Sequence, residues 1–429
     1  TYRVTPGGVL RGTIDVPGDK SISHRSLMFT SIARGESLIE NLLESEDCLA
    51  TRDALLALGA HIVREGPGRY RVQGIEQLAD PENTIDCGNA GTGMRLLTGL
   101  LVGQKINATL VGDESLMRRP MRRIADPLNA MGAEVRTADS GRPPVEVHAS
   151  DRLKSSVHTL SVASAQIKSA IILAGLGANG VTEVTEPHRS RDHTERLLAG
   201  FGLALDVDDL TVRLEGPQRL NACNVRVPAD PSSAAFFAVA ATLCPGSDLT
   251  LRAVGINPTR SGFLDVLDRM GARIERSAVT HVGGEPVCDL RIRSAPLRGI
   301  DVPEAWIART IDEFPVLFVA AAAASGVTRV RGAHELRVKE TDRLAVMADG
   351  LEACGVRCAL YDDGIDVHGG AITGAEVSSG GDHRIAMAFA VAGIIADRPM
   401  TVHDTANVAT SFPGFAALAQ KAGWRVDEL

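Results

Sequence analysis

Aromatic side chains are scarce in this chain of 429 residues, because Phe, Trp and Tyr together make up only 3% of it. Glycine, by contrast, occurs 43 times, and alanine is abundant. An interior with few large rings is filled by small and aliphatic side chains, so helices can pack close to sheets. With an ordinary apolar content, this composition is typical of an α/β protein, and the length predicts two domains or three.

Long hydrophobic runs and an excess of positive charge are also missing. The longest apolar run, Pro315 to Ala324, has about half of the ~20 residues that a membrane helix needs. The first residues contain no basic stretch followed by an apolar one, so we expect no signal peptide. The net charge of −8 argues against nucleic acid as a partner. We therefore expect a soluble, cytoplasmic protein with no nucleic-acid or membrane partner, in which any anion site is local.

The seven cysteines lack the spacing of a disulfide framework or of a metal site. Cys354 and Cys358 form the only close pair and have no histidine nearby, so free buried thiols are a better interpretation than zinc. Free thiols fit a reducing cytosol. The chain has no nucleophile elbow and no spacing of metal ligands, so we predict no metal site.

A pattern of roughly 70 residues recurs six times, longer than the period of solenoid repeats. Each copy has a short strand, a cluster of Gly, Pro, Asp or Ser, a small-residue helix, a second strand, a second helix that ends at a glycine, and further strands. Six such βαβαββ units make two compact domains of three. Length places the boundary near residues 225–233, and the turn "VPGDKS" at 16–21 is a second candidate crossing. The copies begin near residues 13, 84, 158, 225, 300 and 376.

The helix starts of these copies carry unusual charges. In "VPGDKSISHRSL" the Pro-Gly turn ends a strand, and Ser21 or Ser23 is predicted to cap the next helix. Lys20 and Arg25 then lie near a helix N-terminus, where cations are unfavourable unless an anion binds. Ordinary solvated cations on a surface loop are the alternative.

Two further segments are weaker signals. "GNAGTG" at 88–93 can bring backbone N–H groups to a phosphate, but it lacks the ending of a nucleotide P-loop, and tight helix packing explains it equally. "LMRRPMRRI" at 116–124 reads as a solvated loop from which one or two arginines point inward.

The segment "LRVKETDRL" at 336–344 is the most informative. It contains Lys339, Glu340 and Arg343, and Asp312 lies upstream in "RTIDEFP". An ion-paired helix surface is the alternative. Carboxylates that share a site with several cations are what proton transfer on an anionic substrate requires. If the repeats bring their helix starts to a common cleft, these residues predict an enzyme.

Six segments resemble the signatures of one family. "PGDKSISHRSL", "GNAGTGMR", "RRPM", "SAQIKSA", "RVKETDRL" and "DHRIAMAF" are similar, in this order, to motifs of the 5-enolpyruvylshikimate-3-phosphate synthases, and the resemblance spans essentially the whole chain. It implies an α/β (α+β) fold of two similar domains, each with three βαβαββ repeats arranged as an inside-out α/β barrel. The active site would lie in the interdomain cleft. Domain one would comprise residues 1–17 and 230–429, and domain two residues 18–229.

The resemblance also implies a reaction. The enolpyruvyl group of phosphoenolpyruvate would move to the 5-hydroxyl of shikimate 3-phosphate, through a tetrahedral adduct and with release of phosphate. The protein would be a monomer that needs no metal or organic cofactor. Asp312 would take the proton of the attacking hydroxyl, and Lys20 and Glu340 would deliver and remove the proton at the methylene carbon.

Both substrates are anions, and the resemblance implies a mostly basic set of residues for each. Phosphoenolpyruvate would be bound by Lys20, Gly91, Arg119, Gln166, Arg343 and Arg384. Shikimate 3-phosphate would be bound by Lys20, Ser21, Arg25, Ser164, Gln166, Arg191, Asp312 and Lys339. The cations of "VPGDKSISHRSL" would then face two anionic substrates.

Some positions depart from the pattern of the enteric and plant enzymes. Thr410 stands where those enzymes have a phosphate-facing lysine, Ala165 replaces a serine, and Glu335 replaces an asparagine. With Arg191 in "SRDH", these features resemble the second, bacterial class, which is often tolerant of glyphosate. That class commonly has alanine at the position of Gly91, and because the glycine remains we expect glyphosate to inhibit in competition with phosphoenolpyruvate.

Two rival interpretations remain. The sister transferase that acts on UDP-N-acetylglucosamine normally has a cysteine near the position of "MRRPM" and an asparagine after its first lysine. This chain has no cysteine between Cys87 and Cys223, and Ser21 follows Lys20. A non-catalytic anion-binding protein on the same repeats would be expected to lose the acidic residues, whereas both candidate carboxylates are present here.

Overall fold

The computed structural model describes residues 1–429, and the chain divides into two compact units. Unit 1 consists of Thr1–Pro17, Pro228–His281 and Pro286–Leu429, and unit 2 of Gly18–Val227 and Val282–Glu285. The boundaries predicted from the sequence assign every residue after 229 to a single domain. In the structure, the short segment Val282–Glu285 belongs to unit 2 instead.

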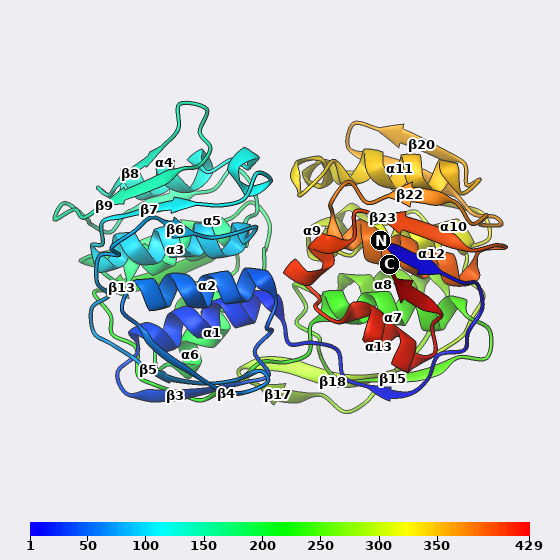
Figure 1. Ribbon diagram of the computed structural model, residues 1–429. Helices are drawn as coiled ribbons and strands as arrows, with labels where there is room; N and C mark the ends of the chain where they lie inside the picture. The colour runs from blue at the N-terminus through cyan, green and yellow to red at the C-terminus, as the bar shows by residue number, and fades with distance from the viewer. The chain divides into compact units, whose positions relative to one another are not determined.

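Unit 2 contains three βαβαββ repeats, drawn in blue to green in Figure 1. The first has α1 (Lys20–Ile32), β3 (Glu36–Glu40), α2 (Glu46–Ala57), β4 (His61–Gly66) and β5 (Arg69–Gln73). The second has β6 (Ile85–Asp86), α3 (Gly91–Gln104), β7 (Ala108–Val111), α4 (Arg122–Ala130), β8 (Glu134–Thr137) and β9 (Val145–His148). The third has β10 (Val157–Thr159), α5 (Ala165–Gly175), β11 (Gly180–Thr185), α6 (His193–Gly200), β12 (Asp206–Asp208) and β13 (Thr211–Gly216).

Unit 1 holds the remaining repeats, together with β1 (Tyr2–Val4) and β2 (Arg11–Ile14). The fourth repeat has β14 (Val225–Arg226), which belongs to unit 2, then α7 (Pro231–Leu243), β15 (Asp248–Gly255), α8 (Gly262–Met270), β16 (Arg273–Arg276), β17 (Thr280–Val282) and β18 (Glu285–Arg293). The fifth has α9 (Ile307–Thr310), α10 (Phe314–Ala323), β19 (Val327–Val330), α11 (Arg343–Ala353), β20 (Cys358–Tyr361) and β21 (Gly364–His368). The sixth has β22 (Glu376–Ser378), α12 (His383–Ile395), β23 (Met400–His403), α13 (Phe415–Ala422) and β24 (Val426–Glu428).

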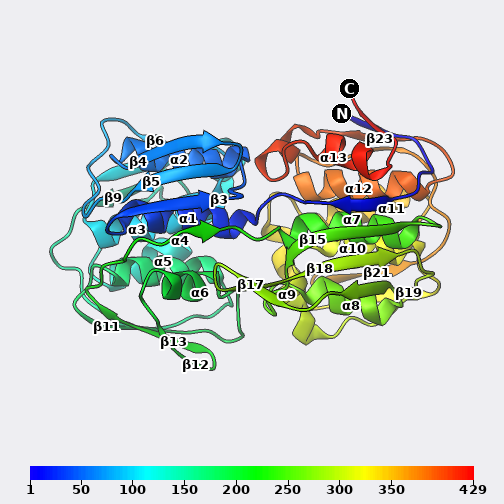
Figure 2. The same cartoon turned by 90° about the horizontal axis from the view of Figure 1, so that it is seen from below.

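The first strands of the first and fourth repeats are exchanged. β2 pairs in parallel with β15 of the fourth repeat, and β14 pairs in parallel with β3 of the first, as Figure 2 allows the reader to follow. β1 lies between β23 and β24, so the two ends of the chain share one sheet. The fifth repeat departs from the predicted pattern, because its first strand is reduced to an isolated bridge between Asp301 and Arg329.

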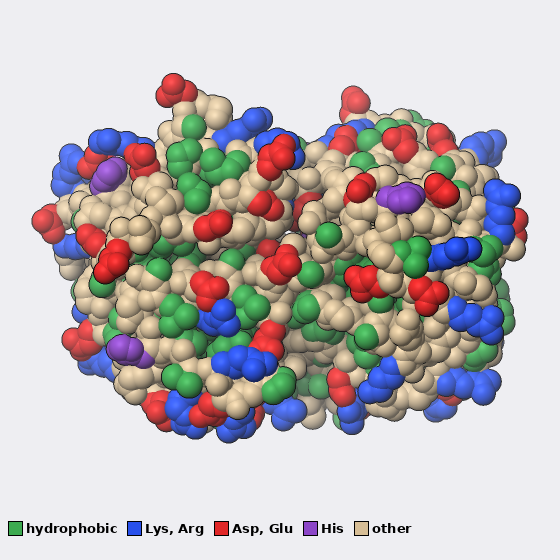
Figure 3. Space-filling model, in the orientation of Figure 1, with side chains coloured by type: hydrophobic (Ala, Val, Ile, Leu, Met, Phe, Trp, Pro, Cys, Tyr) green, Lys and Arg blue, Asp and Glu red, His purple; other side chains and the backbone are tan.

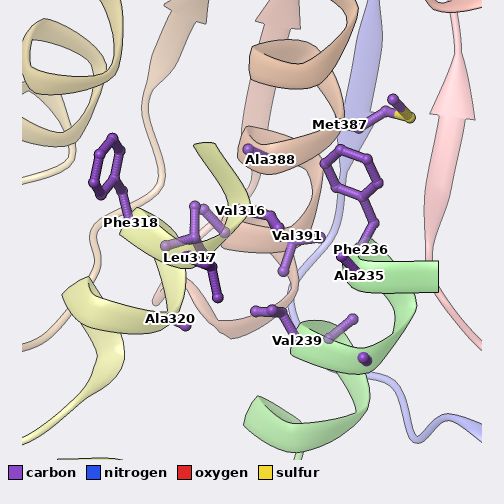
Figure 4. Packing of buried hydrophobic residues seen from close by; sticks show 14 of the residues in the cluster. Ala235, Phe236, Val239, Val316, Leu317, Phe318, Ala320, Met387, Ala388 and Val391 are labelled. Carbon is purple, nitrogen blue, oxygen red and sulfur yellow. The ribbon is translucent and has the colours of Figure 1, made fainter. Parts of the chain in front are cut away.

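Each unit has helices inside and sheets outside, as the predicted inside-out arrangement requires. In unit 1, helices α7, α10 and α12 of the three repeats pack on one another, and Figure 4 shows Val239, Val316 and Val391 from these helices close together. The six sheets stay separate and open, and none closes into a barrel. In unit 2, α3 lies so close to α5 that a Cβ on Gly99 would come within 2.2 Å of the Ala170 carbonyl oxygen. The small residues therefore serve close packing of helix on helix, and not only of helix on sheet.

Helix ends agree with the predicted pattern and one helix start does not. The second helix of every repeat is followed by a glycine with left-handed backbone, namely Gly59, Gly132, Gly202, Gly271, Gly355 and Gly423. The cap of α1 is Asp19, whose carboxylate accepts from the Ile22 N–H at 2.8 Å, so the prediction that Ser21 or Ser23 caps this helix is wrong.

The outer face of the sheet β3–β5–β4 is covered by alternating charges, seen at the lower left of Figure 3. Arg71 pairs with Glu36 and Glu65, and Arg69 pairs with Glu40 and Glu65.

All seven cysteines are free thiols. No helix has the length and apolar character of a membrane span.

Candidate active site

The start of α1 is polar and tightly held. Lys20, the first residue of the helix, forms an ion pair with Asp47 at the start of α2. The main-chain oxygen of Ser21 accepts a hydrogen bond from Arg25 Nη1 at 2.9 Å. The cations of this stretch are therefore held by the fold and are not ordinary solvated side chains on a loop.

Arg25 is a buried cross-link within unit 2. Only 2% of it is exposed, and its guanidinium donates from Nε to Thr194 Oγ1 at 2.7 Å and from Nη2 to Ser169 Oγ at 2.9 Å. Burial lowers the pKa of Arg25 to about 10, which still leaves it charged at neutral pH. Arg191, on the loop before α6, is near enough to lower this pKa further. The two predicted shikimate 3-phosphate arginines of unit 2 are thus brought together.

The start of α3 offers backbone N–H groups beside two arginines. No side chain caps this helix, and of its first N–H groups that of Gly91 donates to the Asn89 carbonyl oxygen at 2.8 Å. A Cβ built on Gly91 would lie 2.8 Å from Arg119 Nη1 and 3.5 Å from Arg95 Nη1. Arg119 Nη2 donates to Asn89 Oδ1 at 2.7 Å. Glycine at 91 leaves room for a guanidinium next to the helix N-terminus, which is the geometry of an anion site.

The side-chain amide of Gln166 is held by hydrogen bonds at both its oxygen and its nitrogen. Its Oε1 accepts from Arg95 Nη1 at 2.7 Å, and its Nε2 donates to Thr92 Oγ1 at 2.9 Å. Ser164 precedes it as the cap of α5 and accepts from the Ile167 N–H at 3.4 Å. Arg95 is not among the predicted substrate-binding residues, and in the structure it fixes this amide.

Lys168 does not belong with the substrate cations, although it follows a predicted binding segment. Its ammonium lies 2.8 Å from both Glu186 Oε2 and Glu195 Oε1, and all three side chains are buried. Burial acts to lower the pKa of Lys168, and the two carboxylates outweigh burial and raise it. We call Lys20, Arg25, Arg95, Arg119 and Arg191 the basic cluster of unit 2.

In unit 1 the predicted residues surround one buried arginine. Arg343 is 1% exposed, and its Nε lies 2.7 Å from Asp382 Oδ2. Its Nη2 lies 2.5 Å from Glu340 Oε2, and its Nη1 lies 3.3 Å from Asp312 Oδ1. Lys339 Nζ lies 3.4 Å from the same Asp312 oxygen. Although burial opposes it, the three carboxylates raise the pKa of Arg343 above its ordinary value.

Arg384 joins this group through the main chain. Its Nη1 donates to the Asp312 carbonyl oxygen at 3.0 Å and lies 3.8 Å from Glu313 Oε1. Thr410 Oγ1 donates to the Asn407 carbonyl oxygen at 2.7 Å, so this side chain is turned onto its own backbone. We call Asp312, Lys339, Glu340, Arg343, Asp382 and Arg384 the acid–base cluster of unit 1.

Three acidic residues in or beside these clusters are not predicted from the sequence. Asp382 is a member of the acid–base cluster, Asp47 pairs with Lys20, and Glu313 lies beside Arg384. Asp47 lies in the first turn of a helix capped by Ser45, which is a common place for an acidic residue, so no local signal marks it. Glu313 follows a predicted base directly, and that adjacency is the one clue. Of the four arginines at 116–124, Arg119 and Arg123 are half-buried, which confirms that one or two point inward.

A buried arginine shared by three carboxylates in one unit, and five cations near the starts of α1, α3 and α6 in the other, are typical of an enzyme that acts on small anionic substrates. The family model for EPSP synthase (3-phosphoshikimate 1-carboxyvinyltransferase) matches residues 4–418. The chain belongs to this family.

Relatives and solved structures agree across nearly the whole chain. The 3-phosphoshikimate 1-carboxyvinyltransferase of Xanthomonas euvesicatoria pv. vesicatoria is 53% identical, over 98% of this chain and 96% of that protein. The enzyme of Methylococcus capsulatus is 52% identical, over 99% and 98%. The structure of EPSP synthase from Acinetobacter baumannii, 45% identical, has a TM-score of 0.90 and covers 99% of both chains. The enolpyruvyl transferase NikO from Streptomyces tendae, at 19% identity and a TM-score of 0.79 over 99% and 98%, shares the fold. The UDP-N-acetylglucosamine alternative is not favoured.

Proposed function

We propose that this chain transfers the enolpyruvyl group of phosphoenolpyruvate to the 5-hydroxyl of shikimate 3-phosphate, giving 5-enolpyruvylshikimate 3-phosphate and phosphate. The observation that carries the proposal is the acid–base cluster. Two carboxylates, Asp312 and Glu340, share Arg343 beside Lys339 in a chain of this family. Carboxylates that share a site with cations can transfer protons on a bound anionic substrate. A non-catalytic anion-binding protein would have no use for this arrangement.

The proposed reaction has two steps, and each of them includes a proton transfer. In the addition step Asp312 removes the proton of the 5-hydroxyl, whose oxygen bonds to C2 of phosphoenolpyruvate while the methylene carbon gains a proton and becomes a methyl group. In the elimination step the methyl group loses a proton and the C2–O bond to phosphate breaks. Lys20 and Glu340 deliver and remove the proton at this carbon.

The anionic groups of the substrates are held by the cations. For phosphoenolpyruvate the supporting geometry is the start of α3 with Arg119, and Arg343 and Arg384 in unit 1. For shikimate 3-phosphate it is the fixed Arg25 with Arg191, and Lys339 beside the proposed base. Charged hydrogen bonds from such donors are stronger than neutral ones. We propose the full predicted set, including Ser21, Ser164 and Gln166, as substrate contacts.

The test is release of phosphate on mixing the protein with both substrates, with each substrate alone as control. We expect release only with both. Asp312→Asn and Glu340→Gln should each lower kcat by at least about 100-fold, the usual contribution of a general acid or base. Asp349→Asn, an exposed aspartate on α11, is the matched control and should keep full activity. Unchanged turnover in Asp312→Asn would contradict the assignment of the base.

We also propose that glyphosate inhibits in competition with phosphoenolpyruvate. The support is Gly91, which carries no methyl group that would crowd an inhibitor beside Arg119. Inhibition kinetics at several phosphoenolpyruvate concentrations would check it. An inhibition constant far above the Michaelis constant for phosphoenolpyruvate would refute it.

A further inference from the structure

The segment Val282–Glu285 forms the turn between β17 and β18, and it belongs to unit 2 although the chain on both sides belongs to unit 1. Its two glycines lie directly against the backbone of unit 2. A Cβ on Gly283 would lie 3.2 Å from the Arg226 carbonyl oxygen, and one on Gly284 would lie 3.2 Å from that of Arg196. Both glycines also have positive φ, of +57° and +80°, which disfavours any other residue here.

Glu285 is the polar anchor of this turn. It is 3% exposed, and its Oε1 lies 2.6 Å from Nδ1 of His193, which is 2% exposed. Its Oε2 lies 4.0 Å from Arg196 Nε, and Arg196 Nη1 donates to the Gly284 carbonyl oxygen at 3.5 Å. A carboxylate buried to this extent is held in place by its partners, because leaving them costs its desolvation without compensation.

The first turn of α6 links this anchor to the proposed shikimate 3-phosphate residues. His193 contacts Glu285, and the next residue, Thr194, accepts from Arg25 Nε at 2.7 Å. Thr194 Oγ1 is also 2.7 Å from Ser169 Oγ on α5. The negative charge of Glu285 also acts to raise the pKa of Arg25, against the effect of burial. A shift of His193 would therefore move the acceptor that fixes the Arg25 guanidinium.

We infer that Glu285 is a positioning residue for shikimate 3-phosphate. It holds His193 and with it the first turn of α6, so that Arg25 and the preceding loop with Arg191 keep the geometry in which they bind the substrate's anionic group. This inference rests on the proposed function. Glu285 touches no reacting atom in this scheme, and its effect is exerted on affinity for one substrate.

The experiment compares Glu285→Ala, Glu285→Gln and wild type by calorimetric titration with shikimate 3-phosphate alone, followed by steady-state kinetics. We expect Glu285→Ala to raise the Kd for shikimate 3-phosphate by about tenfold, which corresponds to about 1.4 kcal/mol. The KM for phosphoenolpyruvate and kcat at saturation should change by less than about twofold. Glu285→Gln keeps an oxygen that accepts from His193 and should restore most of the affinity. Glu275→Ala, an exposed glutamate on β16 of the same sheet, is the matched control and should match wild type.

Three results would overturn the inference. One is a folded Glu285→Ala that binds shikimate 3-phosphate as wild type does. Another is an equal loss of affinity for both substrates together with a lowered Tm, because general destabilisation of the protein would have this effect. If Glu285→Ala does not fold, His193→Gln takes its place. The third result that would overturn the inference is a His193→Gln variant that binds shikimate 3-phosphate with wild-type affinity. A wild-type protein that neither binds shikimate 3-phosphate nor releases phosphate would instead refute the proposed function.

Discussion

Replacing Gly91 with alanine is expected to displace a single guanidinium. The added Cβ would lie 2.8 Å from Arg119 Nη1, whereas an ordinary contact between such atoms is about 3.5 Å. Arg119 must therefore move by about 0.7 Å. That shift would stretch the 2.7 Å hydrogen bond from Arg119 Nη2 to Asn89 Oδ1. Because the displaced atom is the end of a flexible side chain, the Tm should change little.

The effect should fall on phosphoenolpyruvate. A hydrogen bond to a charged group contributes about 1.5–3 kcal/mol, so a misplaced Arg119 should raise the KM for phosphoenolpyruvate by about 10- to 100-fold. The Kd for shikimate 3-phosphate should stay within about twofold. Steady-state kinetics of Gly91→Ala measures both, and Gly66→Ala, where an added Cβ meets nothing within 4 Å, is the control. An unchanged KM for phosphoenolpyruvate would refute the view that Arg119 binds this substrate.

The pH dependence of stability should reflect His24, which is wholly buried and whose pKa burial lowers to about 3. Since the unfolded chain binds this proton near pH 6.5, the free energy of unfolding should fall by about 1.4 kcal/mol per pH unit below 6.5, and His24→Asn should remove this part of the slope in denaturant titrations at pH 7 and 5. If the free energy of unfolding of His24→Asn depends on pH as steeply as that of wild type, His24 is not the cause. Lys168→Met leaves Glu186 and Glu195 buried without their cation and should cost about 3–5 kcal/mol in urea unfolding. Lys105→Met, which removes an exposed pair, should cost less than about 1 kcal/mol, and equal losses in the two variants would show that burial is not the cause.

Local chemistry in the sequence was sufficient to predict the helix ends. The glycines after the second helices were predicted as C-caps, and all of them have left-handed backbone. The start of α1 was harder, because Asp19, Ser21 and Ser23 are all good capping residues within five positions. Which of them caps depends on the residue at which the helix begins, and propensity alone does not decide this. Most of the acid–base cluster was predicted, because Lys339, Glu340 and Arg343 lie in one short motif and Asp312 and Arg384 lie in two others.

The remaining site features depend on contacts between distant parts of the chain. Lys168 has the local sequence of a substrate cation, and only the packing of Glu186 and Glu195 against it shows that it is structural. Glu285 pairs with His193 across 92 residues, through a turn that no repeat pattern predicts. Buried ion pairs of this kind leave no periodic signal in one sequence.

The exchange of β2 and β14 has a consequence for how the chain acquires its structure during synthesis. Nearly all of unit 2 is one continuous stretch, Gly18–Val227, so it can fold while the rest is still being made. Residues 2–14 are made before unit 2, yet β2 must wait for β15, and β1 must wait for β23 and β24. Until those partners are translated, each strand presents unpaired edges. A segment made before unit 2 thus completes its pairing after unit 2, and a chain stopped short of β23 carries β1 as an open edge for aggregation.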